Sequence, residues 1–163
     1  MSLRNRDVLV GMSGVVNVSG QMKEQRQCDG CSACCEVLRI DVLDKPTYQK
    51  CEHVCDGGGC GVYGSRPVAC QSFRCLWLLG HLDEGQRPDK LGVMLTVTEH
   101  PLTGKAIMFT EVHDEAMVRP EVVAAMREAV ARLPIAIMRK GENVLVRNEQ
   151  ELDDLLGMQS ACA

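Results

Sequence analysis

The chain has 163 residues, ten cysteines and a formal net charge of −4, a length that suits one domain or two small units sharing a core. Residues 28–75 carry six acidic and five basic side chains, so no basic surface for a nucleic-acid partner is expected. No apolar stretch reaches the length of a membrane span, and the first 20 residues are too polar for a signal peptide. These features predict a cytoplasmic protein without a membrane partner.

The first 80 residues divide into a lead-in and a cysteine-rich segment. Residues 1–27 give weak signals, with a short strand or helix expected around residues 7–18. Residues 28–80 are rich in turns. Alternating apolar residues predict one short strand at Glu36–Leu43, and Pro67 is expected at the first position of a helix spanning Val68–Leu79.

Residues 88–157 have a different pattern, in which apolar alternation and helical stripes follow one another. The expected strands are residues 93–97, 106–112, 135–139 and 144–147, and the expected helices begin at Pro120 and at Asn148. Glu151, three residues after Asn148, suggests a capping box. The predicted fold class is α+β, with a cysteine-rich metal-binding module packed on a small ββαββα half that shares its core.

The cysteines are the most informative feature, because nine of the ten fall between residues 28 and 75. They are Cys28, Cys31, Cys34, Cys35, Cys51, Cys55, Cys60, Cys70 and Cys75. Thiols at two-residue spacing let a chain present several sulfur ligands to one metal ion or one cluster. Disulfides are rare in a reducing compartment, so ligation of metal is favoured over a disulfide framework.

The opening run, C-x2-C-x2-C-C, bears on the type of centre. Cys28, Cys31 and Cys34 have the spacing that bacterial ferredoxins use for three corners of a [4Fe–4S] cluster. Zinc ribbons more often use two separate C-x2-C pairs. Spacing alone therefore favours iron–sulfur slightly over zinc. Cys35 is expected to point away from Cys34 and to ligate a second centre.

The segment from Cys60 to Cys75 surrounds its thiols with other chemistry. Arg66 is the expected cation beside a thiolate-rich centre, and Tyr63 and Phe73 are expected to shield that centre from water. Pro67 stiffens the approach to Cys70, where backbone amides at a helix start can donate to a thiolate.

This segment completes a resemblance. C-x2-C-x2-C-C, a later single cysteine and C-x-V-Y-x-x-R-P-x-x-C-x-x-F-x-C resemble the CxxCxxCC family of zinc- or iron-chelating domains (YkgJ-like) over about residues 28–77. The resemblance implies metal-ligand roles for Cys28, Cys31, Cys34, Cys35, Cys51, Cys60, Cys70 and Cys75. Cys55 is an addition to the pattern. Metal binding follows from the resemblance, but no reaction does.

Eight matched thiols suit two four-ligand centres, which we prefer to one centre with four spare thiols. The expected cofactor is zinc or a [4Fe–4S] cluster, in one or two centres. The expected function is intracellular metal binding, with a structural role or a docking surface for a protein partner. The alternative is an iron–sulfur redox protein or metalloenzyme component. His53 is expected beside the site rather than as a ligand, and Cys162 is not expected to bind metal.

Overall fold

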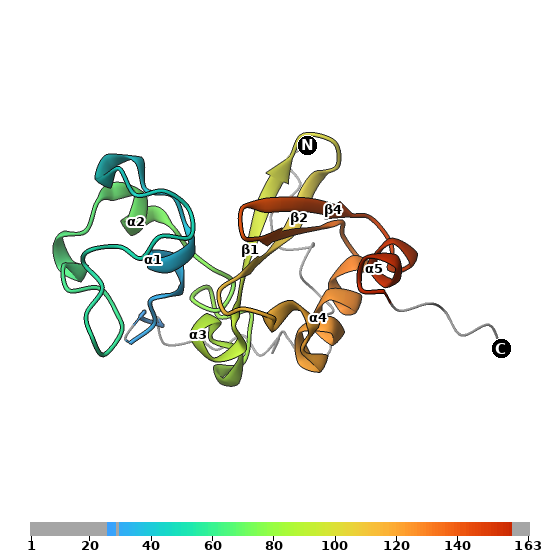
Figure 1. Cartoon of the computed structure of the whole chain (residues 1–163), viewed down its shortest axis with the longest axis horizontal. Coiled ribbons are helices and arrows are strands. Elements are labelled where there is room, and N and C mark those ends of the chain that lie inside the picture. The colour runs from blue at the N-terminus through green and yellow to red at the C-terminus, as the bar shows by residue number, and fades with distance from the viewer. Residues whose placement is uncertain (1–25, 29, 158–163) are drawn as a thin grey trace, which may run out of the picture.

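The computed structural model describes residues 26–28 and 30–157, which form a mixed α/β fold with a four-stranded sheet and five α-helices (Figure 1). The α-helices are α1 (Ala33–Val37), α2 (Val68–Ser72), α3 (Pro88–Leu91), α4 (Pro120–Val130) and α5 (Glu149–Leu155). The strands are β1 (Val93–His100), β2 (Gly104–Glu111), β3 (Ile135–Arg139) and β4 (Glu142–Val146). Short 3-10 helices cover Asp41–Leu43, Tyr63–Ser65, Glu84–Gln86 and Ala116–Val118. The element predicted around residues 7–18 lies outside the described residues.

The sheet has the strand order β1-β2-β3-β4. Two antiparallel hairpins, β1–β2 and β3–β4, meet along the parallel pair β2–β3. Parallel neighbours need a crossover, and α4 supplies it between β2 and β3. The predicted order of strands and helices after residue 91 therefore agrees with the structure.

One face of the sheet forms the main core. Ile107, Phe109 and Ile135 are at most 2% exposed, and they belong to one buried cluster with Met126 of α4 and Leu152 of α5. Alternation along each strand puts these sheet residues on a single face. The buried side of α4 is accordingly the one that carries Val122, Met126 and Val130.

The predicted boundaries in this half are close to the observed ones. Strand β2 begins at Gly104 and strand β4 at Glu142, each two residues before the predicted start. Asn148 caps α5 by accepting the Glu151 amide proton at 3.0 Å. Glu151 returns its carboxylate to the amide of Arg147 instead of to Asn148, so only one half of the predicted capping box forms.

The cysteine-rich segment, residues 28–80, corrects two predictions. The strand predicted at Glu36–Leu43 is wrong, because α1 occupies residues 33–37 and only Ile40 makes a β-bridge, to Lys45. A single β-bridge is too little pairing to form a strand. The helix predicted from Val68 stops at Ser72, and Pro67 is its N-cap rather than its first residue.

The early end of α2 has a visible cause. Phe73 adopts an extended backbone conformation, and the chain then approaches the edge strand, where the Leu76 amide donates to the Leu95 carbonyl at 2.8 Å. Continuing the helix would remove that bond. Cys75 is thereby carried to the boundary between the cysteine-rich segment and the sheet.

A close backbone contact fixes the turn at residues 56–59. Gly58 has a φ of +84°, and a Cβ at this position would lie 2.5 Å from the Gly30 carbonyl oxygen. Only glycine fits both the left-handed conformation and the close approach. The contact ties this turn to the loop between the first two cysteines.

The cysteine-rich segment packs beside the sheet half (Figure 1). Val37, Leu76 and Trp77 belong to the same buried cluster as the sheet residues. The Tyr48 hydroxyl also donates to the Met138 carbonyl at 3.1 Å.

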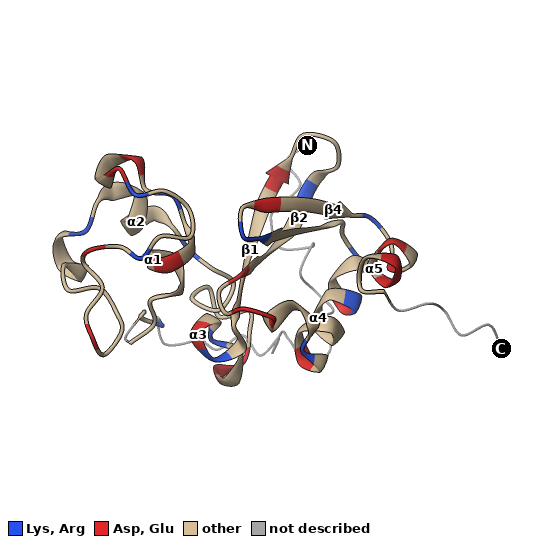
Figure 2. Ribbon diagram, viewed as in Figure 1, with Lys and Arg blue, Asp and Glu red and all other residues tan. Residues whose placement is uncertain are grey.

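Acidic and basic residues are interspersed in both parts (Figure 2). No helix within the described residues has the length and apolarity needed to cross a membrane.

Candidate metal centre

A cavity of about 160 Å³ lies inside the cysteine-rich segment. Seven cysteines line it: Cys28, Cys31, Cys34, Cys35, Cys51, Cys60 and Cys70. Tyr63, Arg66 and Phe73 line it as well. Seven of the eight thiols in the implied ligand set therefore meet at one place, although they are spread over some forty residues of sequence.

A smaller cavity of about 20 Å³ adjoins the sheet. Its cysteines are Cys28, Cys31, Cys34 and Cys75, which we call the first thiol group. Trp77, Pro88 and Met94 line the same cavity, so this group lies against the core. The eighth implied ligand, Cys75, is thus brought to the C-x2-C-x2-C run from more than forty residues away.

The remaining four implied ligands, Cys35, Cys51, Cys60 and Cys70, form what we call the second thiol group. The Cys51 amide donates to the Cys35 carbonyl at 2.9 Å, and a β-bridge joins Val54 to Cys60. Electrostatic interactions connect Cys70 to each of the other three thiols. Burial raises the pKa of Cys70, and the neighbouring thiols raise it further.

The two groups meet at neighbouring residues of α1. The sulfurs of Cys34 and Cys35 are 4.0 Å apart, about twice the length of a disulfide bond. A hydrogen bond from the Cys34 thiol lowers the pKa of Cys35 to about 7. Lys45 and Arg66 lower it too, against the effect of burial. The same hydrogen bond, together with burial, raises the pKa of Cys34.

Hydrogen-bond donors surround the first thiol group. Burial and Cys75 raise the pKa of Cys28, and a hydrogen bond from the Tyr63 side chain opposes that rise. Burial likewise raises the pKa of Cys31, against hydrogen bonds from the backbone of Ala33 and Asp89. Backbone amides at the start of α2 were expected to donate to a thiolate. The Cys70 amide does not, because it donates to the Pro67 carbonyl at 2.9 Å.

Cys75 completes this pattern. Burial raises its pKa, and backbone hydrogen bonds from Leu78 and Trp77 lower it. Amide donors of this kind stabilise a thiolate without adding a charge. The tight turn after Cys75, closed by the Leu79 amide on the Cys75 carbonyl at 3.1 Å, places those amides near the sulfur.

Arg66 lies between the two groups. Its guanidinium stacks 3.7 Å from the centre of the Tyr63 ring and donates to the Tyr63 carbonyl at 2.7 Å. It interacts electrostatically with Cys28 of the first group and with Cys35 and Cys70 of the second. The structure therefore brings both predicted accessory residues, Tyr63 and Arg66, to the thiols.

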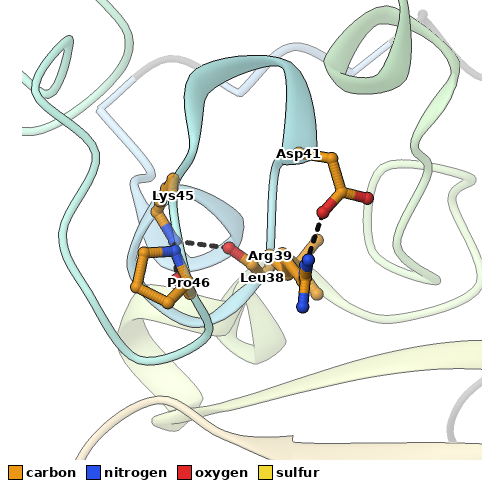
Figure 3. A network of polar contacts seen from close by, with 5 residues as sticks. All are labelled: Leu38, Arg39, Asp41, Lys45 and Pro46. Atoms are coloured by element: carbon orange, nitrogen blue, oxygen red, sulfur yellow. Dashed lines mark hydrogen bonds and ion pairs between the residues drawn. The ribbon is translucent and has the colours of Figure 1, made fainter.

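Lys45 is a feature that sequence reasoning missed. Its residue is only 5% exposed, and its ammonium group donates to the Leu38 carbonyl and, at 3.2 Å, to the Pro46 carbonyl (Figure 3). Burial lowers its pKa, and interactions with Cys51, Cys35, Cys34 and Cys70 oppose this. Figure 3 also shows that the nearby Arg39 is paired with Asp41. A lysine isolated between two cysteine runs, next to a proline turn, was the available signal.

The other candidates lie outside the two groups. Cys55 is exposed and lines neither cavity, although its sulfur would lie 3.1 Å from a Cβ at Gly61. His53 lines the larger cavity and pairs with Glu52 at 3.7 Å. Cys162 lies outside the described residues.

The donor set suits a soft metal, because thiolates are preferred ligands of zinc and of iron–sulfur clusters. As the side chains are placed, no three His, Cys, Asp or Glu residues in the described part of the chain are set to hold a metal ion. Metal binding at these thiols would therefore require side-chain movement. Chemistry, burial and convergence of the thiols are consistent with a centre; a preformed coordination sphere is not present among the described residues.

No protein-family model, curated protein or solved structure matches this chain. The resemblance to the CxxCxxCC family consequently rests on the cysteine pattern and on Tyr63, Arg66 and Phe73. The geometry of the cysteine-rich segment carries the functional argument.

Proposed function

We propose that this protein binds zinc or an iron–sulfur centre through the clustered thiolates of residues 28–75, and that the bound centre stabilises the cysteine-rich segment. The observation that carries the proposal is the convergence of seven cysteines on one cavity. The packing of a hydrophobic core does not require so many thiols in one place. Thiolate ligation explains both their number and their accompanying cations.

The structural role follows from how little else holds the segment. Its α-helices, α1 and α2, have five residues each, and its β structure is limited to two isolated bridges. Isolated helices of this length are unstable in water. A structural zinc site contributes on the order of 10 kcal/mol of folding free energy, enough to order such a segment.

An iron–sulfur redox function is the second candidate, and one observation favours it. The smaller cavity joins the C-x2-C-x2-C run to the distant Cys75, the ligand arrangement that bacterial [4Fe–4S] proteins use. The larger cavity, at about 160 Å³, has room for several atoms. In this case the chain would carry electrons or serve a metalloenzyme, with a protein partner docking nearby.

Anaerobic purification followed by elemental analysis tests the proposal and separates its two forms. A colourless protein with zinc supports the structural form, and a brown protein with iron and sulfide supports the redox form. A preparation without metal, which also takes up none when zinc or iron and sulfide are supplied, refutes metal binding.

Hydrogen exchange then tests whether the metal stabilises the segment. After treatment with a strong chelator, amides of residues 30–80 are expected to lose protection, while those of β1–β4 keep it because the sheet has its own core. Equal protection of residues 30–80 before and after metal removal contradicts the structural role.

A further inference from the structure

We infer that the eight thiols form two separate metal centres, one from the first thiol group and one from the second. This inference rests on the proposed function and adds the number of sites and the ligands of each. The first centre would use Cys28, Cys31, Cys34 and Cys75. The second would use Cys35, Cys51, Cys60 and Cys70.

The first centre is supported by the smaller cavity, although Cys28, Cys31 and Cys34 also line the larger one. Of the nine cysteines that the structure describes, only the four of the first group line the cavity against Met94 and Trp77. Cys75 does not line the larger cavity. Its sulfur is therefore available to the C-x2-C-x2-C run and not to the second group.

The second centre is supported by backbone contacts. The Cys51 amide bonds to Cys35, and the Val54 amide bonds to the Cys51 carbonyl at 3.1 Å while Val54 bridges Cys60. These bonds bring three of the four second-group residues together independently of any thiol interaction. Cys70 joins them through its electrostatic interactions.

The helical geometry of α1 separates the two centres. Consecutive residues of an α-helix lie about 100° apart around its axis, so the side chains of Cys34 and Cys35 leave α1 in different directions, although their sulfurs are 4.0 Å apart. One metal ion takes four thiolates in a tetrahedron, and a single [4Fe–4S] cluster also takes four. Eight converging thiols thus exceed what one centre of either type can use.

The two centres also differ in how their negative charge is compensated. Around the first, the guanidinium groups of Arg66 and Arg87 interact with Cys28 and Cys31, alongside donors from the Tyr63 side chain and from backbone amides at Ala33, Asp89 and Leu78. The second has the buried ammonium of Lys45, whose thiol interactions are with Cys51, Cys35, Cys34 and Cys70. Three of those four belong to the second group. Different surroundings for the two sets are expected of two sites.

The test is the zinc stoichiometry of single and double variants of the full chain. Each protein is purified anaerobically, stripped, and titrated with Zn²⁺ alone. Cys75→Ser and Cys51→Ser are each expected to bind half as much zinc as the wild type, and the double variant none, because serine is far harder to deprotonate than cysteine. Cys55→Ser is the matched control and keeps the full amount.

Two further measurements keep the test decisive. Because Cys75 and Cys51 are buried, Cys31→Ser and Cys60→Ser repeat the experiment at more accessible members of each group. Protection of β1–β4 from hydrogen exchange shows that each variant is folded. If a folded single variant loses all its zinc, or none, the division into two centres is wrong while metal binding stands. A wild-type chain that binds no zinc or iron–sulfur centre refutes the proposed function instead.

Discussion

The buried ammonium group of Lys45 allows the electrostatics of the second thiol group to be tested with one substitution. Lys45→Met keeps the length of the aliphatic chain and removes the charge together with the donors to the Leu38 and Pro46 carbonyls. We expect metal at Cys35, Cys51, Cys60 and Cys70 to be held more weakly. Metal at the first thiol group should be retained.

The expected size of the effect follows from two opposing contributions. Hydrogen bonds from a charged donor stabilise by about 1.5–3 kcal/mol each. Burying an ammonium group costs several kcal/mol, and at 5% exposure Lys45 has lost nearly all its contact with water. These contributions offset each other in the metal-free chain, so its stability should change little.

The metal-bound chain differs because the thiolates are then charged. Removing the cation beside them should weaken metal binding by about 10- to 100-fold, the usual effect of losing a group that supports the ligands. That range corresponds to about 1.4–2.8 kcal/mol. The loss should therefore appear in metal affinity rather than in the stability of the metal-free protein.

Competition with a chelator measures this affinity, with zinc release followed separately in the Cys75→Ser and Cys51→Ser backgrounds. Lys50→Met is the matched control, because Lys50 is exposed and the change in net charge is the same. The Lys45 effect should be present when the second group is the remaining site, and absent when the first remains. Equal zinc release from the Lys45 and Lys50 variants would refute the argument.

Two more outcomes are expected. Arg66→Ala should weaken metal binding at both groups by about 10- to 100-fold, measured by the same competition. Arg66→Lys should restore binding only in part, because lysine cannot both stack on Tyr63 and bond its carbonyl as the guanidinium does. Unchanged binding in Arg66→Ala would contradict this expectation. Burial raises the pKa of Cys28, Cys31 and Cys75 above 9.0. Metal uptake near neutral pH should therefore release protons, and metal binding should tighten as pH rises. The metal-free chain should lose stability above pH 9 as these thiols ionise. Calorimetric titration in buffers of different ionisation enthalpy measures the released protons, and none would be seen if these thiols were already ionised.

The sheet half could be predicted from sequence because its elements follow from local periodicity. Alternation along Val93, Leu95 and Val97 indicates strand β1, although only Val93 and Leu95 are buried and Val97 is exposed. The predicted stripe of Val122, Met126, Val130 and Leu133 includes the buried face of α4, and Pro120 marks the start of that helix. The pairing of β2 with β3 could not be predicted in the same way. It depends on where α4 returns the chain, which is a tertiary effect.

The cysteine-rich segment was harder to predict because its local signals conflict with tertiary contacts. Alternation of Val37, Ile40 and Val42 suggested a strand, but Val42 is exposed and Val37 is the buried end of α1. The helix after Pro67 was overextended because the bond between Leu76 and Leu95 cannot be read from a sequence window. Lys45 was missed for the same reason, since its burial results from the turn that surrounds it.

The positions of the two thiol groups relative to the core suggest that they do not contribute equally to stability. The first group lies against Trp77, Pro88 and Met94, so its ligands are tied to residues that the sheet already holds in place. The second group is contacted mainly by turns of the cysteine-rich segment, such as the bridge between Val54 and Cys60. Metal bound at the second group would therefore have more of the chain to order, with less structure already in place around it. If both groups bind metal as proposed, the second centre would determine whether the outer part of the segment folds, and the first would join the segment to the rest of the protein.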